Sequence, residues 1–339
     1  MKTHKTAIHI ADIKQTSKEI FSDIAKRGIQ KTLEKGESVL IFANKKGVHT
    51  GMVCKECWHI PYCNQCDIPI WLYQNLHNHM FWLCPICQHT YEVITQCPSC
   101  GHGKLDPYWV GIQQVAEYCK KQFTPNVIII QSSNSNSHPK IQQLFFQLRQ
   151  KPLIIIATSL LQYSVVKVWL LVFQNALQVN IPDYNTELRN YQFLSTAIHS
   201  YQAPHAIIQT YQPDHAIIQS ISQQDPAMFL DQDQVFRIKH HYPPFGELCI
   251  ISYKHVIETS LFTSVNNLFH DMLALKQKWG YEHIQVYAIP AMIYKIYGKY
   301  RYQIVIKWEH IREFIDIVFQ ELKPYSKWFK FDRGAQSFF

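Results

Sequence analysis

Residues 54–100 read CKECWHIPYCNQCDIPIWLYQNLHNHMFWLCPICQHTYEVITQCPSC and hold eight of the ten cysteines of this 339-residue chain. The eight fall into four Cys-x2-Cys pairs, which are separated in turn by five, 17 and nine residues. Two cysteines at this spacing present their sulfurs along one edge of a tetrahedron, and two such pairs complete the shell of one Zn²⁺ ion. The stretch therefore predicts two closed, structural zinc sites, with the ligands Cys54, Cys57, Cys63, Cys66, Cys84, Cys87, Cys97 and Cys100.

The short segment between the first two pairs limits how the four pairs can combine. Five residues between Cys57 and Cys63 are few for a loop that folds one pair onto the next. The spacing therefore favours interleaved or nested pairing over sequential pairing, and it leaves both of these arrangements open.

Disulfides and free thiols are the alternatives to metal. A secreted, disulfide-bonded protein begins with an apolar signal segment, whereas this chain begins MKTHKTAIHIADIKQ. We therefore expect a reducing, cytoplasmic environment, in which clustered thiols bind metal. The two remaining cysteines, Cys119 and Cys249, are expected to be buried in a helix and a strand.

Histidines and aromatic residues are dense around the cysteines. Because the cysteine set is complete, the histidines are expected on the surface or behind the ligands; they are His59, His77, His79, His89 and His102. The aromatic side chains either stack on unpaired bases or fill a small core. Few Lys or Arg residues lie between them, which favours the core; they are Trp58, Tyr62, Trp71, Tyr73, Phe81 and Trp82.

An alternation of helices and buried strands brackets the cysteine block. Before it we expect a strand over Ala7–Ile13, a helix that Ser17 caps and Gly36 follows, and a strand over Glu37–Asn44. After it we expect helices over Val110–Phe123, Lys140–Arg149 and Thr186–His199, and strands over Asn126–Gln131, Pro152–Ala157 and His205–Tyr211. The block is therefore interpreted as an insertion into one α/β domain.

The last third of the chain has a different pattern. A near-repeat, HAIIQTYQPDHAIIQS at 205–220, precedes it and is too short to indicate a solenoid. An α+β domain is then expected, with strands over Glu247–Tyr253, Ile284–Ala288, Tyr302–Trp308 and Trp328–Asp332, and helices over Glu258–Trp279 and Glu309–Leu322.

One apolar stretch, Leu153–Phe173, is long enough to span a bilayer. Gln162, Ser164 and Lys167 interrupt it, and a charged residue in the middle of a membrane is costly. Its many β-branched residues favour two buried strands instead, so a membrane is not expected among the partners.

Composition sets broad limits on the class of protein. A hydrophobic content of 47% excludes a disordered chain, and the length predicts two or three domains. The 33 Lys and Arg residues against 25 Asp and Glu residues give a net charge of +8, which fits a polyanionic partner without requiring one.

The cysteine block and the segments around it together resemble one family, the replication-restart helicase PriA, or primosomal protein N′. Its members carry eight cysteines in this order, inserted into the second helicase lobe after a strand that is similar to VLIFANKKG at 39–47. Further similar segments follow in the same order: WVGIQQVAEYCKKQF (109–123), PLIIIATSLL (152–161), PDYNTELRNYQFL (182–194), HAIIQTYQPDHAIIQ (205–219), RIKHHYPPFGELCIISY (237–253) and KYRYQIVIK (299–307).

This resemblance implies an α/β fold: a RecA-like second helicase lobe, interrupted by a two-zinc module and followed by an α+β C-terminal domain. The implied segments are 1–50 for the start of the lobe, 51–103 for the module, 104–220 for the remainder of the lobe and 221–339 for the C-terminal domain. The family's first lobe and N-terminal DNA-binding region are not expected in this chain.

ATP hydrolysis is not expected of this chain alone, and no catalytic residue is assigned. The phosphate-binding pattern G-x-x-x-x-G-K-[ST] does not occur in the sequence. The chain reads ATSL at 157–160, where the family has motif V, and STAIHSY at 195–201, where the family has the arginines of motif VI. An arginine finger accelerates phosphoryl transfer about 10³- to 10⁵-fold, so a first lobe from another chain does not obviously rescue hydrolysis.

The leading hypothesis is a degenerate PriA-like primosomal protein that binds forked or single-stranded DNA, or a primosome or single-strand-binding partner. One alternative is half of a split ATP-dependent 3′-5′ DNA helicase, completed by a separate first-lobe chain. The other is a zinc-stabilised protein-interaction scaffold with no DNA role.

Contacts to DNA phosphates are expected from Lys45, Lys46, Lys299 and Arg301. Tyrosines and basic residues alternate over 299–302, which puts one type on each face of a strand. A solvated strand end is an equal alternative for Lys45 and Lys46, and protection of an edge strand by charge is the alternative role for Lys299 and Arg301.

Overall fold

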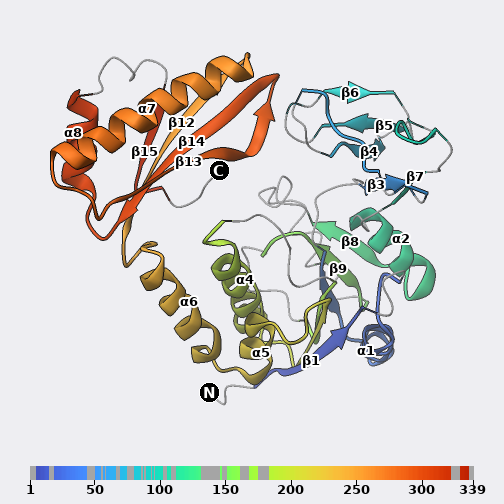
Figure 1. Ribbon diagram of the computed structural model, residues 1–339. Helices are drawn as coiled ribbons and strands as arrows, with labels where there is room; N and C mark the ends of the chain where they lie inside the picture. The colour runs from blue at the N-terminus through green and yellow to red at the C-terminus, as the bar shows by residue number, and fades with distance from the viewer. Residues whose placement is uncertain are drawn as a thin grey trace.

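The computed structural model describes residues 5–14, 19–43, 50–54, 56–57, 59–65, 69–74, 80–84, 87, 89–92, 94, 96–101, 105–107, 112–130, 146, 151–160, 168–174, 183–321 and 329–335. These residues form a parallel sheet of six strands, an antiparallel sheet of five strands in the cysteine block and an antiparallel sheet of four strands near the C-terminus (Figure 1). Several features expected above lie outside the described residues: Lys45, Lys46, Trp58, Cys66, His77, His79, His102 and all but one residue of the helix over Lys140–Arg149.

The six-stranded sheet has the order β1-β11-β10-β2-β9-β8, and all of its pairings are parallel. Its strands are β1 (Ala7–Asp12), β2 (Val39–Phe42), β8 (Val127–Ile130), β9 (Ile154–Ala157), β10 (Leu170–Phe173) and β11 (His205–Thr210). Every residue of β2, β9 and β10 is buried, as in a parallel sheet covered on both faces.

Among the described residues, four helices cover the two faces of this sheet. Helices α1 (Asp23–Glu34) and α2 (Ile112–Gln122) share one apolar core with residues such as Ile41 and Ile156. Helices α4 (Thr186–Tyr201) and α5 (Ala216–Gln223) share the other core with Leu40 and Ile155. Alternate residues of one strand therefore enter opposite cores, and the expected α/β class is confirmed.

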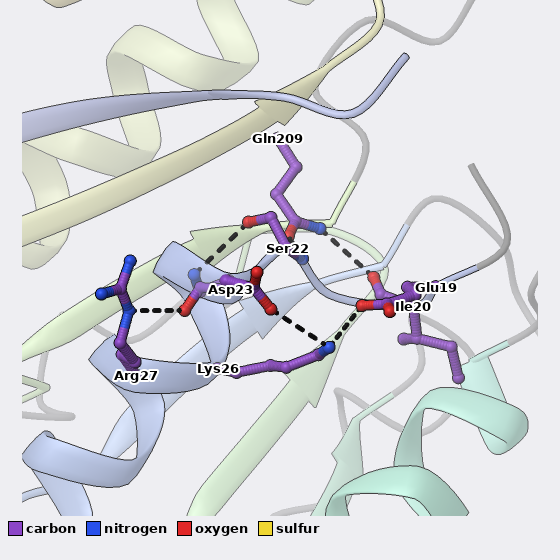
Figure 2. A network of polar contacts seen from close by, with 8 residues as sticks. Glu19, Ile20, Ser22, Asp23, Lys26, Arg27 and Gln209 are labelled. Atoms are coloured by element: carbon purple, nitrogen blue, oxygen red, sulfur yellow. Dashed lines mark hydrogen bonds and ion pairs between the residues drawn. The ribbon is translucent and has the colours of Figure 1, made fainter. Parts of the chain in front are cut away.

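A buried side chain of β11 fixes the start of α1 (Figure 2). Gln209 Oε1 accepts a hydrogen bond from the Ser22 backbone N–H at 2.6 Å, and Gln209 Nε2 donates to the carbonyls of Gln174 at 3.0 Å and Ile20 at 3.3 Å. The N-cap is Ser22, whose side chain accepts from the backbone N–H of Ala25. The expectation of Ser17 as the cap is wrong, because Gln209 anchors the chain at Ser22 and the helix begins only there.

The near-repeat forms two different structures. Its first copy, His205–Gln209, lies in β11, between the parallel strands β1 and β10. In its second copy, His215 caps α5, and its Nδ1 accepts from the backbone N–H of Ile217 at 3.3 Å. The same five residues, HAIIQ, therefore form a strand where two strands flank them, and they form the start of a helix after the turn at Pro213.

The C-terminal sheet is antiparallel, in the order β13-β14-β12-β15. Its elements are β12 (Glu247–His255), α7 (Glu258–Lys278), β13 (Gln285–Ile296), β14 (Lys299–Trp308), α8 (Arg312–Glu321) and β15 (Phe329–Arg333). Helices α7 and α8 pack on one face of the sheet around Leu268 and Phe314. A helix that the sequence pattern did not predict, α6 (Ala227–Lys239), leads from α5 to this sheet (Figure 1).

A compact polar junction joins the two parts at the end of α6. The buried Arg237 donates to the carboxylate of Asp233 at 2.6 Å and to the carbonyls of Pro243 at 2.9 Å and Tyr184 at 3.3 Å. The Tyr184 hydroxyl donates to the Ala335 carbonyl at 3.1 Å. Arg237 and Tyr184 therefore tie the helical side of the parallel sheet to the C-terminal sheet.

The apolar stretch Leu153–Phe173, which is long enough to span a bilayer, contributes two buried strands, β9 and β10. Within the part of the chain that the structure describes, no helix combines the length and the hydrophobicity needed to cross a bilayer.

Candidate metal centres

The cysteine block is an insertion whose two ends pair with each other. Its strands are β3 (Thr50–Cys54), β4 (Trp71–Gln74), β5 (Met80–Leu83), β6 (Thr90–Tyr91) and β7 (Leu105–Pro107), in the order β6-β5-β4-β3-β7. The entering strand β3 and the leaving strand β7 are antiparallel neighbours, with Cys54 opposite Leu105. The first and last strands of the block therefore lie side by side, and none of its described strands belongs to the parallel sheet.

The first cysteine cluster joins the first and the fourth Cys-x2-Cys pairs. The sulfurs of Cys54, Cys57, Cys97 and Cys100 all lie within 4.8 Å of one another. The distance from Cys54 Sγ to Cys100 Sγ is 3.7 Å, and that from Cys57 Sγ to Cys97 Sγ is 3.5 Å. With Zn–S bonds of about 2.3 Å, the edge of a tetrahedral shell is about 3.8 Å, so this cluster fits a tetrahedral thiolate-bound metal.

The second cluster joins the second and the third pairs. The sulfurs of Cys63, Cys84 and Cys87 lie within 4.8 Å of one another, and those of Cys63 and Cys87 are 3.7 Å apart. Cys66, the expected fourth ligand, lies outside the described residues. Of the two arrangements that the spacing left open, the described cysteines adopt the nested one.

Each Cys-x2-Cys pair with the turn that it forms is called a knuckle below. In two of the knuckles a backbone N–H two residues after the first cysteine donates to the sulfur of that cysteine. Gln65 N–H donates to Cys63 Sγ at 3.4 Å, and Ser99 N–H donates to Cys97 Sγ at 3.4 Å. Two knuckles contain the same kind of turn, in which the backbone N–H of the first cysteine donates to the carbonyl of a histidine five residues later. Cys54 donates to His59 at 2.9 Å, and Cys84 donates to His89 at 3.0 Å. N–H donors favour the ionised form of sulfur, which is the form that binds a metal.

Tyr91 supports the second cluster, a role that the sequence pattern did not indicate. Its hydroxyl donates to Cys63 Sγ at 3.1 Å and accepts from the Asn64 backbone N–H at 3.1 Å. Burial acts to raise the pKa of the Cys63 thiol, but the Tyr91 hydroxyl and the Gln65 N–H donate to its sulfur and the pKa is lowered. A tyrosine four residues beyond the Cys84–Cys87 pair was the available signal.

The histidines and aromatics that the structure describes play supporting roles. His59 and His89 contribute backbone carbonyls to knuckle turns, and the clusters formed by the described residues contain cysteines only. Trp82 is 1% exposed and lies in the module's apolar core with Ile70 and two cysteines. Tyr62, by contrast, is 49% exposed.

The residues expected to contact DNA divide into two groups. Lys45 and Lys46 lie outside the described residues, whereas Lys299 and Arg301 lie on β14. Tyr300 and Tyr302 pack against the core beneath α7, so Lys299 and Arg301 lie on the opposite face of the sheet. The expected separation of the two residue types is therefore present.

Two further exposed cations share this face, which also carries the buried Lys307 and the exposed carboxylate of Asp332. Lys254 of β12 is directly opposite Arg301, and Lys330 of β15 is opposite Ser252, which is opposite Gln303. We call Lys254, Lys299, Arg301 and Lys330 the basic face. Among the described residues, no carboxylate forms an ion pair with any of the four.

No protein-family model matches the chain. Curated relatives do: over 329 residues, 93% of this chain and 40% of the relative, it is 26% identical to the replication restart protein PriA of Bacillus subtilis. It is 24% identical to the protein of the same name from Thermotoga maritima, over 84% of this chain and 38% of the relative. With that of Borreliella burgdorferi it shares 26% identity, over 88% of this chain and 45% of the relative. The chain thus spans roughly two fifths of the length of these relatives.

Proposed function

We propose that this chain is a PriA-like replication-restart protein that binds DNA through its C-terminal sheet and carries two structural zinc ions. The observation that carries the proposal is the collinear similarity over 84–93% of the chain, combined with two cysteine clusters inside the matching region. We assign 1–50 and 104–220 to a RecA-like second helicase lobe, 51–103 to the zinc module and 221–339 to the C-terminal domain.

Zinc is proposed for both clusters because of their donor sets. Thiolates are soft ligands, and a tetrahedral set of four selects zinc or an iron–sulfur centre over magnesium or calcium. Zinc bound there would hold the knuckles together, and a shell of four cysteines leaves no position open for a substrate. The proposed ligands are Cys54, Cys57, Cys97 and Cys100 at one site, and Cys63, Cys66, Cys84 and Cys87 at the other. Metal analysis of the purified chain should find two zinc ions per molecule.

DNA is the proposed partner of the basic face. Lys254, Lys299, Arg301 and Lys330 present four positive charges on one side of one sheet, and among the described residues no carboxylate forms an ion pair with them, although Asp332 lies on the same face. A row of unpaired cations attracts a phosphate backbone and releases its counterions. Lys45 and Lys46 are proposed as additional phosphate contacts.

We propose that the chain does not hydrolyse ATP by itself. The 339 residues contain no G-x-x-x-x-G-K-[ST] pattern, and the segment STAIHSY at 195–201 contains no arginine. This segment belongs to α4, where Leu194, Ala197 and Ile198 are used for packing in the core. A chain without a phosphate loop and without an arginine finger lacks the groups that stabilise the transferred phosphoryl.

The test is a DNA-binding titration over a range of salt concentrations, with forked and single-stranded oligonucleotides. The double variant K254A/R301A should bind more weakly and lower the slope of log affinity against log salt by about 0.7 to 0.9 for each phosphate that it no longer neutralises. The matched control is K120A/K121A, which removes the same charge from exposed positions of α2.

Three results would contradict the proposal. Undetectable binding of the unmodified chain at low salt favours the interaction scaffold with no DNA role. An equal loss of affinity in both double variants means that net charge, and not the basic face, attracts DNA. ATP turnover by the chain alone would contradict the proposed lack of hydrolysis, and turnover that requires a separate first-lobe chain would favour the split helicase.

A further inference from the structure

The hairpin between β13 and β14 reaches the zinc module, although the two are more than 200 residues apart in sequence. Gly298 N–H donates to the Gln65 carbonyl at 3.0 Å, and Lys295 Nζ donates to the Asn64 carbonyl at 3.4 Å. Ile296 packs against the apolar core of the module. The tip of the hairpin accordingly lies beside the module in Figure 1.

The turn of the hairpin is built to make this contact. Tyr297 and Gly298 have φ values of 52° and 73°, and they form a two-residue loop between the paired residues Ile296 and Lys299. In such a loop both central residues have positive φ, and the N–H of the second is not used to close the turn. That N–H is the group that donates to Gln65.

The two carbonyls that receive the hairpin belong to a knuckle of the second cluster. The N–H of Gln65 donates to Cys63 Sγ, and the N–H of Asn64 donates to Tyr91, whose hydroxyl donates to the same sulfur. The Gln65 N–H belongs to the same peptide group as the Asn64 carbonyl, so the Cys63 sulfur orients that carbonyl directly. Tyr91 holds the preceding peptide group, which carries the Asn64 N–H. Among the described residues, no backbone hydrogen bond or apolar packing of this kind links the first cluster to the C-terminal sheet.

We propose that the Asn64–Gln65 knuckle is the docking surface for the β13–β14 hairpin, and that metal at the second cluster, not the first, holds the hairpin in place. Cys63, Cys84 and Cys87 would hold the metal, and Cys63 Sγ, fixed in this way, would orient the Asn64–Gln65 peptide through the Gln65 N–H. The Asn64 carbonyl of that peptide and the adjoining Gln65 carbonyl receive the Lys295 ammonium and the Gly298 N–H. The hairpin continues into the basic face, so the docking sets the position of Lys299 and Arg301 relative to the module. The inference rests on the proposed zinc sites and is independent of DNA binding.

Hydrogen–deuterium exchange of the full chain tests this inference, with the peptide that spans 294–300 as the readout and zinc counted by native mass spectrometry. The variant C87S should lose one zinc ion and speed exchange of the Gly298 amide about fivefold or more, as expected when a hydrogen bond of typical strength is removed. The matched control C97S should also lose one zinc ion, from the first cluster, and leave this exchange unchanged.

A second variant tests whether the effect of C87S results only from unfolding of the module. Y91F retains all cysteines, so it should keep two zinc ions while speeding exchange of the hairpin tip, because the Asn64 N–H and the Cys63 sulfur both lose the hydroxyl that links them. Exchange at Gly298 that is unchanged in both C87S and Y91F overturns the inference, and so does equal acceleration in C97S. An unmodified chain that binds no zinc instead overturns the proposed metal sites, so the two failures are distinguishable.

Discussion

Gln209 is a single polar side chain that lies fully buried in the α/β domain. Its amide satisfies the Ser22 N–H and the Ile20 carbonyl at the start of α1 (Figure 2). It also donates to the carbonyl of Gln174, the residue after β10. A shorter apolar residue would leave all three groups without a partner in a place that water does not reach. Each unsatisfied buried group costs about 1–3 kcal/mol, so this position has a large share in stability.

We therefore expect Q209A to lower the free energy of unfolding by about 3 kcal/mol or more, which urea denaturation followed by circular dichroism would measure. The chain supplies its own control at the equivalent position of the repeat. Gln219 is half-buried and donates to one carbonyl, that of Pro213, so Q219A should cost about 1 kcal/mol. Equal losses in the two variants would contradict the role given to Gln209.

At the scale of elements, α4 and α5 are linked at their first turns. Glu187 Oε1 in α4 lies 3.4 Å from Nε2 of His215, the N-cap of α5. The hydrogen bond from His215 lowers the pKa of Glu187, against the opposing effect of burial. A lowered carboxylate pKa stabilises the folded state above its ordinary pKa, and this contribution is lost as the pH falls through the lowered value.

The variant E187Q should accordingly be less stable than the unmodified chain at pH 6, and the difference should shrink below about pH 4 as the carboxylate takes up a proton. The effect is small, because the side chain is mostly exposed and solvent screens the pair. Thermal unfolding at the two pH values would measure it. A difference that grows on acidification would mean that the Glu187 charge does not stabilise the fold.

Elements with strong apolar patterns were predictable from the sequence, and elements defined by their partners were not. The strands around Ile41, Ile155 and Val172 follow from runs of buried β-branched residues. The two copies of HAIIQ could not be distinguished by their letters, because neighbouring strands decide the first and a turn and a histidine cap decide the second. Helix α6 was missed because it buries few residues, among them Phe229 and Arg237, and so has no clear apolar stripe.

For the candidate site, local features were likewise predictable from the sequence, and contacts between distant segments were not. The Cys-x2-Cys spacing indicated the ligand types and disfavoured sequential pairing, since both depend on local geometry alone. The choice of nested pairing depends on where β3 places Cys54, its last residue, and where β5 places Cys84, the residue that follows it, which is a property of the module's sheet. The contacts of Tyr91 and Gly298 depend on distant segments meeting, and no spacing rule predicts that.

At the scale of the whole molecule, the ten thiols fall into two chemical classes. Burial raises the pKa of Cys119 and of Cys249 to about 12 each, and neither belongs to a cysteine cluster among the described residues. The thiolate is the reactive form, so these two remain unreactive near neutral pH for as long as the domains stay folded. The other eight are the proposed metal ligands and are protected by metal.

Alkylation by iodoacetamide at pH 8 should therefore proceed in three stages that mass spectrometry can count. The metal-loaded chain should be labelled slowly, the chain treated with a chelator should accept eight labels, and only denaturant should expose Cys119 and Cys249. Labelling of either residue at the chelator stage would mean that the metal sites support the cores of the α/β and C-terminal domains as well as the module.

The register of the parallel sheet also governs the order in which the newborn chain can fold. Within the described sheet β1 is an edge strand beside β11, with Ala7 opposite His205, so this partner emerges nearly 200 residues later. At about 5–20 residues per second, the first strand leaves the ribosome roughly 10–40 seconds before it can be paired. The cysteine pairs, in contrast, meet within residues 54–100, so the inserted module is ready to fold while the domain that surrounds it still waits for its closing strand.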